Sequence, residues 1–352
     1  MTSRERVAAI LDGKIPDRVA MDESPWSETY QRWRQEGLPE NTSVTDYFGM
    51  DIAKVGGPDL TFRLEPKVLA EDDAYVTSIN SDGVTARRHK SESGHTPHWL
   101  DHTIKTKEDW YTYAERLTPA RDRWAADIVQ QCQAARDTGR YVTICHADPY
   151  ERAWPTWGQV RIFEMMMDDP QTIGDCFMTY ARLMTAQYQI LEDLGAQWDA
   201  VFMYTDLGYR NSTLFSPALY DELLFPAHKH ITDWLSAHGK KLICHSCGRI
   251  LTLIPRFIEV GFAAIQPLEA KCGQDVRELK QLYGGQITFF GNIDVRALSG
   301  TKEDVYNEVM GKLPKAMEGG GYIFHSDHSV PPTVSFENYC YAVELVREHG
   351  VY

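Results

Sequence analysis

The chain has 352 residues, of which 43% are hydrophobic and 24% charged, enough for one large domain or two ordinary ones. The formal net charge is −14 and no run of Lys or Arg interrupts it, so nucleic acid is not an expected partner. No apolar stretch approaches the ~18 residues of a membrane-spanning helix, and the N-terminal residues lack the apolar segment of a secretory signal. The seven scattered cysteines indicate reduced thiols. We therefore expect a cytoplasmic protein without a membrane partner.

The region from about residue 24 to 140 is the least regular part of the sequence. It is rich in turn residues, and residues 68–78 and 83–89 are predicted to form a small β-hairpin. We interpret this region as an insertion near the mouth of the main fold.

The rest of the chain alternates short apolar runs with longer helical segments. Strands are predicted at residues 141–145, 200–204, 241–244, 263–266, 287–290 and 322–324. Helices are predicted at about residues 170–194, 216–238, 250–260, 275–283, 302–317 and 335–349. This alternation predicts βα units around a parallel sheet. No Gly-x-Gly-x-x-Gly follows any strand, which favours a closed (β/α)8 TIM-type barrel over a doubly wound dinucleotide-binding sheet. We expect one barrel domain over residues 1–352.

Two of the predicted strands are followed by residues that commonly bind metals. His245 and Cys247 come directly after residues 241–244, and alternation along an extended chain places both side chains on the same side. Imidazole and thiolate both suit zinc, which needs at least one more ligand. Asp327 and His328, with His325 before them, follow the last strand and are candidates for it. A buried pair without metal is the alternative interpretation of His245 and Cys247.

Other polar side chains also follow strands, where (β/α) barrels carry their chemistry. Candidate catalytic residues are His146, Asp206 and Glu269, and candidate substrate-binding residues are Asp148, Trp154, Tyr204, Asn292 and Asp294. For Asp206 and Asp294 the alternative is helix capping, and for Trp154 it is packing.

Several motifs together resemble the uroporphyrinogen-decarboxylase superfamily. They are Asp206-Leu207-Gly208, Ser216-Pro217, His245-Ser246-Cys247-Gly248, Gly291-Asn292-Ile293-Asp294 and Gly319-Gly320-Gly321-Tyr322-Ile323. The resemblance implies a somewhat distorted TIM barrel and one of two activities. Decarboxylases of the superfamily carry an arginine-rich segment after the first strand, whereas residues 22–28 here are acidic. The zinc-dependent branch transfers methyl groups between corrinoid proteins and small thiols, amines or methoxy compounds, and its His-x-Cys-Gly zinc motif matches residues 245–248.

The sequence therefore predicts a corrinoid-dependent methyltransferase. The resemblance implies zinc held by His245, Cys247 and either Asp327 or His328. It also implies a partner protein that carries the cobalamin, and we further consider a homodimer. A metal-free decarboxylase or other lyase acting on a small acid or tetrapyrrole is the second hypothesis. A non-catalytic barrel that binds a tetrapyrrole or a partner protein is the third.

Overall fold

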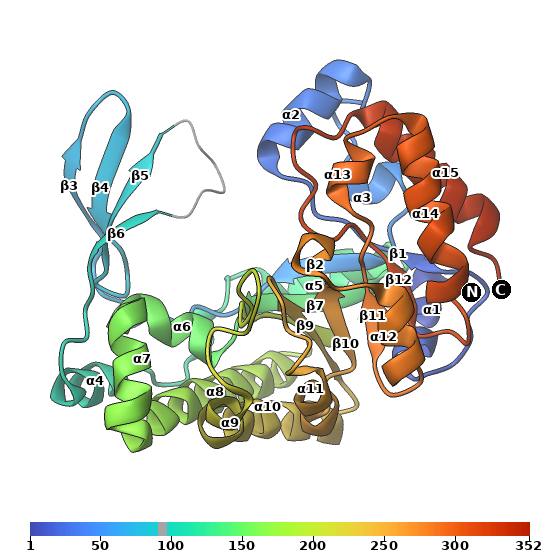
Figure 1. The fold of residues 1–352 in the computed structure, drawn as a ribbon. Helices are drawn as coiled ribbons and strands as arrows, with labels where there is room; N and C mark the ends of the chain where they lie inside the picture. The colour runs from blue at the N-terminus through green and yellow to red at the C-terminus, as the bar shows by residue number, and fades with distance from the viewer. Residues whose placement is uncertain (91–96) are drawn as a thin grey trace.

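The computed structural model describes residues 1–90 and 97–352, and its centre is a parallel eight-stranded sheet (Figure 1). The strands are β1 (Ala20–Met21), β2 (Ile52–Gly56), β7 (Tyr141–Ala147), β8 (Ala200–Tyr204), β9 (Lys241–Ser246), β10 (Ala264–Pro267), β11 (Thr288–Phe290) and β12 (Tyr322–Phe324). Their spatial order is β1-β12-β11-β10-β9-β8-β7-β2, and every named pairing is parallel. The six predicted strands are confirmed, with ends that differ by at most two residues.

The two ends of this sheet, β1 and β2, are joined through Asp51 rather than through a strand ladder. The Asp51 amide donates to the Met21 carbonyl at 2.7 Å, and its carboxylate accepts the Met21 amide at 2.8 Å. Asp51 is fully buried and pairs with Arg6 at 2.7 Å and Arg18 at 3.0 Å. The barrel is thus closed between β1 and β2 by the backbone and side chain of one residue and not by a strand ladder. This irregular closure accounts for the distortion that the resemblance implied.

Helices alternate with the strands, as predicted for a (β/α)8 barrel. They are α1 (Ser3–Leu11), α2 (Ser27–Glu36), α3 (Val44–Tyr47), α4 (Lys107–Ala114), α5 (Ile128–Asp137), α6 (Pro149–Trp157), α7 (Gln159–Asp168), α8 (Pro170–Asp193), α9 (Pro217–Leu219), α10 (Phe225–Ala237), α11 (Ile254–Val260), α12 (Val276–Tyr283), α13 (Val295–Leu298), α14 (Lys302–Ala316) and α15 (Phe336–His349). The helix predicted over residues 216–238 is interrupted by a π turn, Tyr220–Leu224, just before Pro226. Proline lacks an amide hydrogen and crowds the preceding turn, which accounts for the interruption. Within the described ranges, no helix has the length and apolarity needed to cross a bilayer.

A second, antiparallel sheet stands away from the barrel, above α6 and α7 in Figure 1. Its strands are β3 (Lys67–Glu71), β4 (Tyr75–Ile79), β5 (Thr85–His89) and β6 (His98–Asp101). The predicted hairpin falls here, but residues 68–78 form two strands instead of one. The Asp72 carboxylate accepts the amides of Ala74 and Tyr75, which turns the chain between β3 and β4. The irregular region of residues 24–140 also contributes β2 to the barrel itself.

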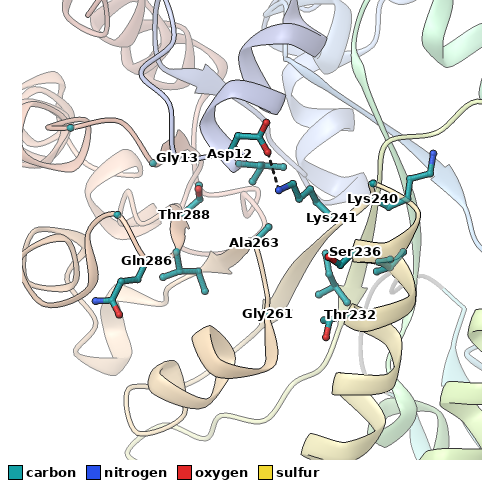
Figure 2. Close-up of a pocket in the computed structure, with 18 residues that line it drawn as sticks. Asp12, Gly13, Thr232, Ser236, Lys240, Lys241, Gly261, Ala263, Gln286 and Thr288 are labelled. Atoms are coloured by element: carbon teal, nitrogen blue, oxygen red, sulfur yellow. Dashed lines mark ion pairs between the residues drawn. The ribbon is translucent and has the colours of Figure 1, made fainter.

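Helix α1 covers the N-terminal end of the barrel. Its Val7 and Ile10 pack with the first inward residues of the strands, including Ala20 and Ile243, in one buried cluster. Beside this floor lies a cavity of about 470 Å³, where Lys241 pairs with Asp12 at 2.9 Å (Figure 2). In (β/α) barrels this end contributes to stability, so the chemistry is sought at the opposite end.

Candidate active site

The C-terminal end of β9 carries the His-x-Cys pair. His245 Nε2 lies 3.4 Å from Cys247 Sγ and 3.4 Å from the Asp206 carboxylate. Asp206 follows β8, and its Oδ1 also accepts the Cys247 backbone amide at 2.9 Å. The three donor atoms lie within 4.8 Å of one another, which is close enough for one metal ion. Neighbouring strands of the barrel thus bring these three residues together.

A second donor group shares the same thiol. Cys247, Glu269 and His328 also have ligand atoms within 4.8 Å of one another. Glu269 follows β10 and His328 follows β12, so the donors around Cys247 come from four strand ends. His328 Nε2 lies 3.9 Å from Glu269 Oε1. The Cys272 thiol donates to the other Glu269 oxygen at 3.2 Å, which fixes the orientation of the carboxylate.

The charges of the site depend on this crowding. Burial has the largest single effect on the pKa of Asp206 and raises it, but the contacts with His245 and with Cys247 together outweigh burial, and the pKa of Asp206 falls below its usual value. Burial raises the pKa of the Cys247 thiol, and the nearby Asp206 and Glu269 carboxylates raise it further. In the absence of a cation the thiol is therefore protonated at neutral pH. A divalent cation between these groups would reverse that preference, because a coordinating thiol is deprotonated outright.

Tyr204 lies beside the donors on the accessible side of the barrel end. Its side chain is 38% exposed, and its ring centroid is 5.4 Å from that of His245. Lys54 Nζ lies 5.1 Å from the centroid of the Phe202 ring, and the centroids of the Phe202 and His245 rings are 6.3 Å apart. Lys54 is also paired with Asp22 at 2.7 Å. Tyr204 can therefore contact a substrate that reaches the donors.

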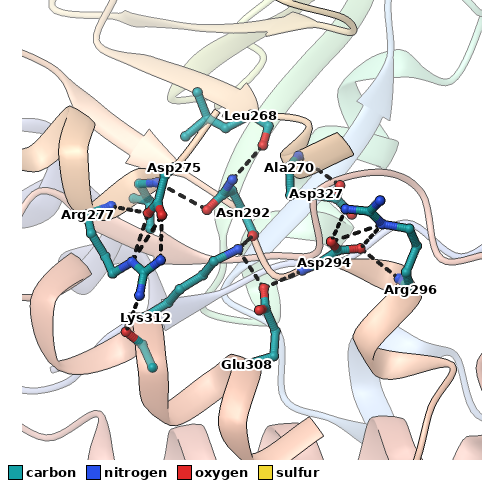
Figure 3. A network of polar contacts seen from close by, with 12 residues as sticks. Leu268, Ala270, Asp275, Arg277, Asn292, Asp294, Arg296, Glu308, Lys312 and Asp327 are labelled. Carbon is teal, nitrogen blue, oxygen red and sulfur yellow. Dashed lines mark hydrogen bonds and ion pairs between the residues drawn. The ribbon is translucent and has the colours of Figure 1, made fainter. Parts of the chain in front are cut away.

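Three candidate residues have structural contacts outside the donor groups (Figure 3). The Asp327 carboxylate, 1% exposed, accepts the backbone amides of Ala270 and Val295, each at 2.9 Å. Asn292, fully buried, donates to the carbonyls of Leu268 and Gln274. Asp294 caps α13 and pairs with Arg296. Asp327 was a candidate metal ligand; both of its oxygens accept backbone amides, and it belongs to neither donor group among the described residues.

His146 and Asp148 are likewise engaged in packing contacts. His146 Nε2 lies 2.6 Å from the Tyr188 hydroxyl of α8, and burial lowers the pKa of His146 to about 4. Asp148 caps α6 and accepts hydrogen bonds from Thr205 at 2.5 Å and His228 at 2.9 Å. Both are contacts between the barrel and its helices. The catalytic role of His146 and the substrate-binding role of Asp148 stay predictions.

Comparisons with known proteins identify the family and the fold of the chain. The family model "Uroporphyrinogen decarboxylase (URO-D)" matches residues 155–349, more than half of the chain. The chain belongs to the uroporphyrinogen decarboxylase family. A methyltransferase from Methanosarcina mazei has a similar fold, with a TM-score of 0.66, 13% identity and 99% of each chain covered. A sugar phosphate isomerase/epimerase from Parabacteroides distasonis gives a TM-score of 0.39 and 9% identity, over 95% of this chain and 97% of the other. No curated protein sequence matches the chain.

Glu151 is a residue near the donor groups that the sequence did not single out. It lies in the first turn of α6, beside Asp206, and burial and the Asp206 charge raise its pKa to about 8. The Trp154 indole donates a hydrogen bond to Glu151 Oε2 at 3.0 Å. In this structure Trp154 therefore holds the Glu151 carboxyl in place. An acid three residues after the capping Asp148 has the ordinary pattern of a helix start, so no sequence signal distinguished it.

The donor set fits a zinc ion. Zinc binds Cys, His and carboxylate ligands, and all three types surround Cys247. Metal-bound histidines usually donate their second ring N–H to a neighbouring group, and His245 Nδ1 is hydrogen-bonded to the Gln266 side chain.

Proposed function

We propose that this protein is a zinc-dependent methyltransferase that exchanges a methyl group between a corrinoid protein and a small methylated substrate. The observation that carries the proposal is the convergence of imidazole, thiol and carboxylate donors on Cys247 in a barrel of this family. The fold shared with a methyltransferase is consistent with it but does not decide the substrate.

We assign the metal to His245, Cys247 and His328, with Glu269 as the fourth donor. This set comes from the ends of three strands and would enclose an ion from several sides, as a tetrahedral zinc site requires. Asp206 is the alternative oxygen donor, but its Oδ1 already accepts the Cys247 amide. When bound, zinc would supply Lewis acidity toward the oxygen, sulfur or nitrogen atom of the substrate.

The remaining residues orient the substrate and hold protons. Tyr204 forms an accessible wall next to His245. Glu151, whose pKa is about 8, keeps its proton at neutral pH and can donate a hydrogen bond to a substrate atom near Asp206. Asp206 holds the loop at Cys247 by accepting its backbone amide, and its carboxylate lies 3.4 Å from His245 Nε2.

The corrinoid is proposed to arrive on a partner protein that docks at the C-terminal end of the barrel. The donors and the exposed Tyr204 ring lie at this end, where methyl transfer needs the cobalt to approach. A homodimer remains compatible with this arrangement, since the proposal places the docking surface at the barrel mouth alone.

The direct test is methyl transfer by the zinc-loaded protein. Methylcob(III)alamin serves as the donor for a panel of thiols, amines and phenols, and cob(I)alamin as the acceptor from their methylated forms. Methylated or demethylated product should form with the native protein and not with Cys247→Ser. Failure with every compound in both directions would overturn the proposal. Release of carbon dioxide from small acids by metal-free protein would support the decarboxylase instead. Residues 22–28 include three acidic residues and no arginine, which disfavours a polycarboxylate substrate.

A further inference from the structure

A buried glutamine lies between two histidines that come from strands β9 and β12, which are not neighbours in the barrel. Gln266 is on β10 and only 4% exposed, and His325, after β12, is fully buried. Gln266 Oε1 is hydrogen-bonded to His245 Nδ1, and its Nε2 lies 3.2 Å from His325 Nε2. The amide therefore connects the candidate metal ligand His245 to an interior histidine that no metal donor group includes.

With Gln266 Oε1 facing His245, this hydrogen bond determines which nitrogen of His245 carries a proton. An amide oxygen only accepts hydrogen bonds, so His245 Nδ1 must be the donor to Gln266. When His245 is neutral, its lone pair is therefore on Nε2, which lies 3.4 Å from Cys247 Sγ and 3.4 Å from the Asp206 carboxylate. This is the nitrogen that faces the metal donors, and it is in the form that binds a metal.

The orientation of the Gln266 amide is itself set by His325. His325 Nδ1 lies 2.6 Å from the Ser326 carbonyl, which can only accept, so neutral His325 has its lone pair on Nε2. The NH₂ group of Gln266 must then face His325, because its oxygen would meet a second acceptor there. Glu23 Oε1 lies 3.2 Å from the same nitrogen. A doubly protonated His325 paired with Glu23 would turn the amide over, and the experiment below distinguishes the two states.

We propose that Gln266 is a positioning residue that presets His245 in its metal-binding tautomer, with its amide oriented by His325. The inference rests on the zinc site of the proposed function. It goes beyond that function because it makes Gln266, which contacts neither metal nor substrate, responsible for the tautomer of His245.

The first measurement is the zinc dissociation constant, obtained by competition with a chromogenic chelator. Gln266→Leu removes the acceptor and should weaken zinc binding by about 10- to 100-fold, the usual effect of losing such a partner. Gln266→Glu keeps an acceptor oxygen and should stay within a few-fold of the native protein. The matched control is Gln187→Leu on α8. Gln187 is fully buried, its side-chain amide has no hydrogen-bond partner among the described residues, and its loss should leave zinc affinity unchanged.

The second measurement is the ¹⁵N spectrum of the histidine rings in the metal-free native protein, with His245→Asn to assign the signals. The proposal requires a protonated Nδ1 in His245. An unprotonated Nδ1, or zinc binding by Gln266→Leu within twofold of native, overturns it. If the native protein binds no zinc, the proposed function fails, while the ring spectrum still decides the role of Gln266.

Discussion

The carboxylate of Asp327 accepts the backbone amide of Ala270 at 2.9 Å and so holds the turn that follows Glu269. Its other oxygen holds Val295 in the same way. Asp327→Asn can satisfy only one of these buried amides with its single oxygen. We expect it to lower the free energy of unfolding by about 1–3 kcal/mol while the protein still binds zinc. Urea unfolding and zinc content measure the two effects. Loss of zinc with unchanged stability would instead identify Asp327 as a ligand.

The buried carboxyl of Glu151 should make stability depend on pH. Its pKa is raised from the usual 4.5 to about 8, so the folded protein keeps a proton that the unfolded chain releases. Stability therefore falls as pH rises through this window and levels off above it. Glu151→Gln removes the cost, and its advantage in melting temperature should grow from about pH 4.5 to 8 in metal-free protein. The exposed Glu164→Gln on α7 is the control. An advantage that does not vary with pH would contradict the assignment.

Closure of the barrel should depend strongly on Asp51. Asp51→Ala leaves the buried Arg6 without this partner and removes an acceptor from the Met21 amide. Breaking a buried ion pair in this way costs about 3–5 kcal/mol. The pair of the exposed Asp46 with the partly buried Arg140 provides the comparison, and Asp46→Ala should cost less than about 1 kcal/mol. Chemical denaturation of both variants tests the difference, and equal effects would mean that Asp51 does not carry the closure.

The two donor groups around Cys247 can be separated by their effect on zinc affinity. If His328 and Glu269 are ligands, His328→Ala and Glu269→Ala should each weaken zinc binding by more than tenfold. Asp206→Ala should have a smaller effect, since it removes only the support of the His245 and Cys247 pair. Chelator competition on the three variants ranks them. A larger loss in Asp206→Ala than in the other two would move the metal to the Asp206 side of the thiol.

The fold was largely accessible from the sequence because six barrel strands are short apolar runs between well-capped helices. β1 and β2 were not predicted as strands from their own residues. β1 has only two residues, and β2 contains Lys54 and ends at Gly56, so neither forms an apolar run. The turn at Asp72 that divides residues 68–78 is a local hydrogen-bond arrangement, which hydrophobic periodicity does not reveal.

The candidate site could be predicted from the sequence only in part. His245 and Cys247 could be paired because they are two residues apart on one strand. The convergence of Glu269 and His328 on Cys247, and the diversion of Asp327 to backbone amides, depend on how loops from three strands approach one another. Adjacent Asp327 and His328 could not be distinguished by sequence alone. Glu151 and Gln266 gain their importance entirely from neighbours that are distant along the chain.

The central claim is that a metal is bound by His245 and Cys247, and elemental analysis of purified protein tests it most directly. The native protein and Cys247→Ala are compared after zinc loading and removal of free metal. Cys132→Ala, which replaces a buried cysteine of α5 outside both donor groups, is the control. The account predicts about one zinc per chain in the native and Cys132→Ala proteins and none in Cys247→Ala. No zinc in the native protein, or equal zinc in all three, would contradict it.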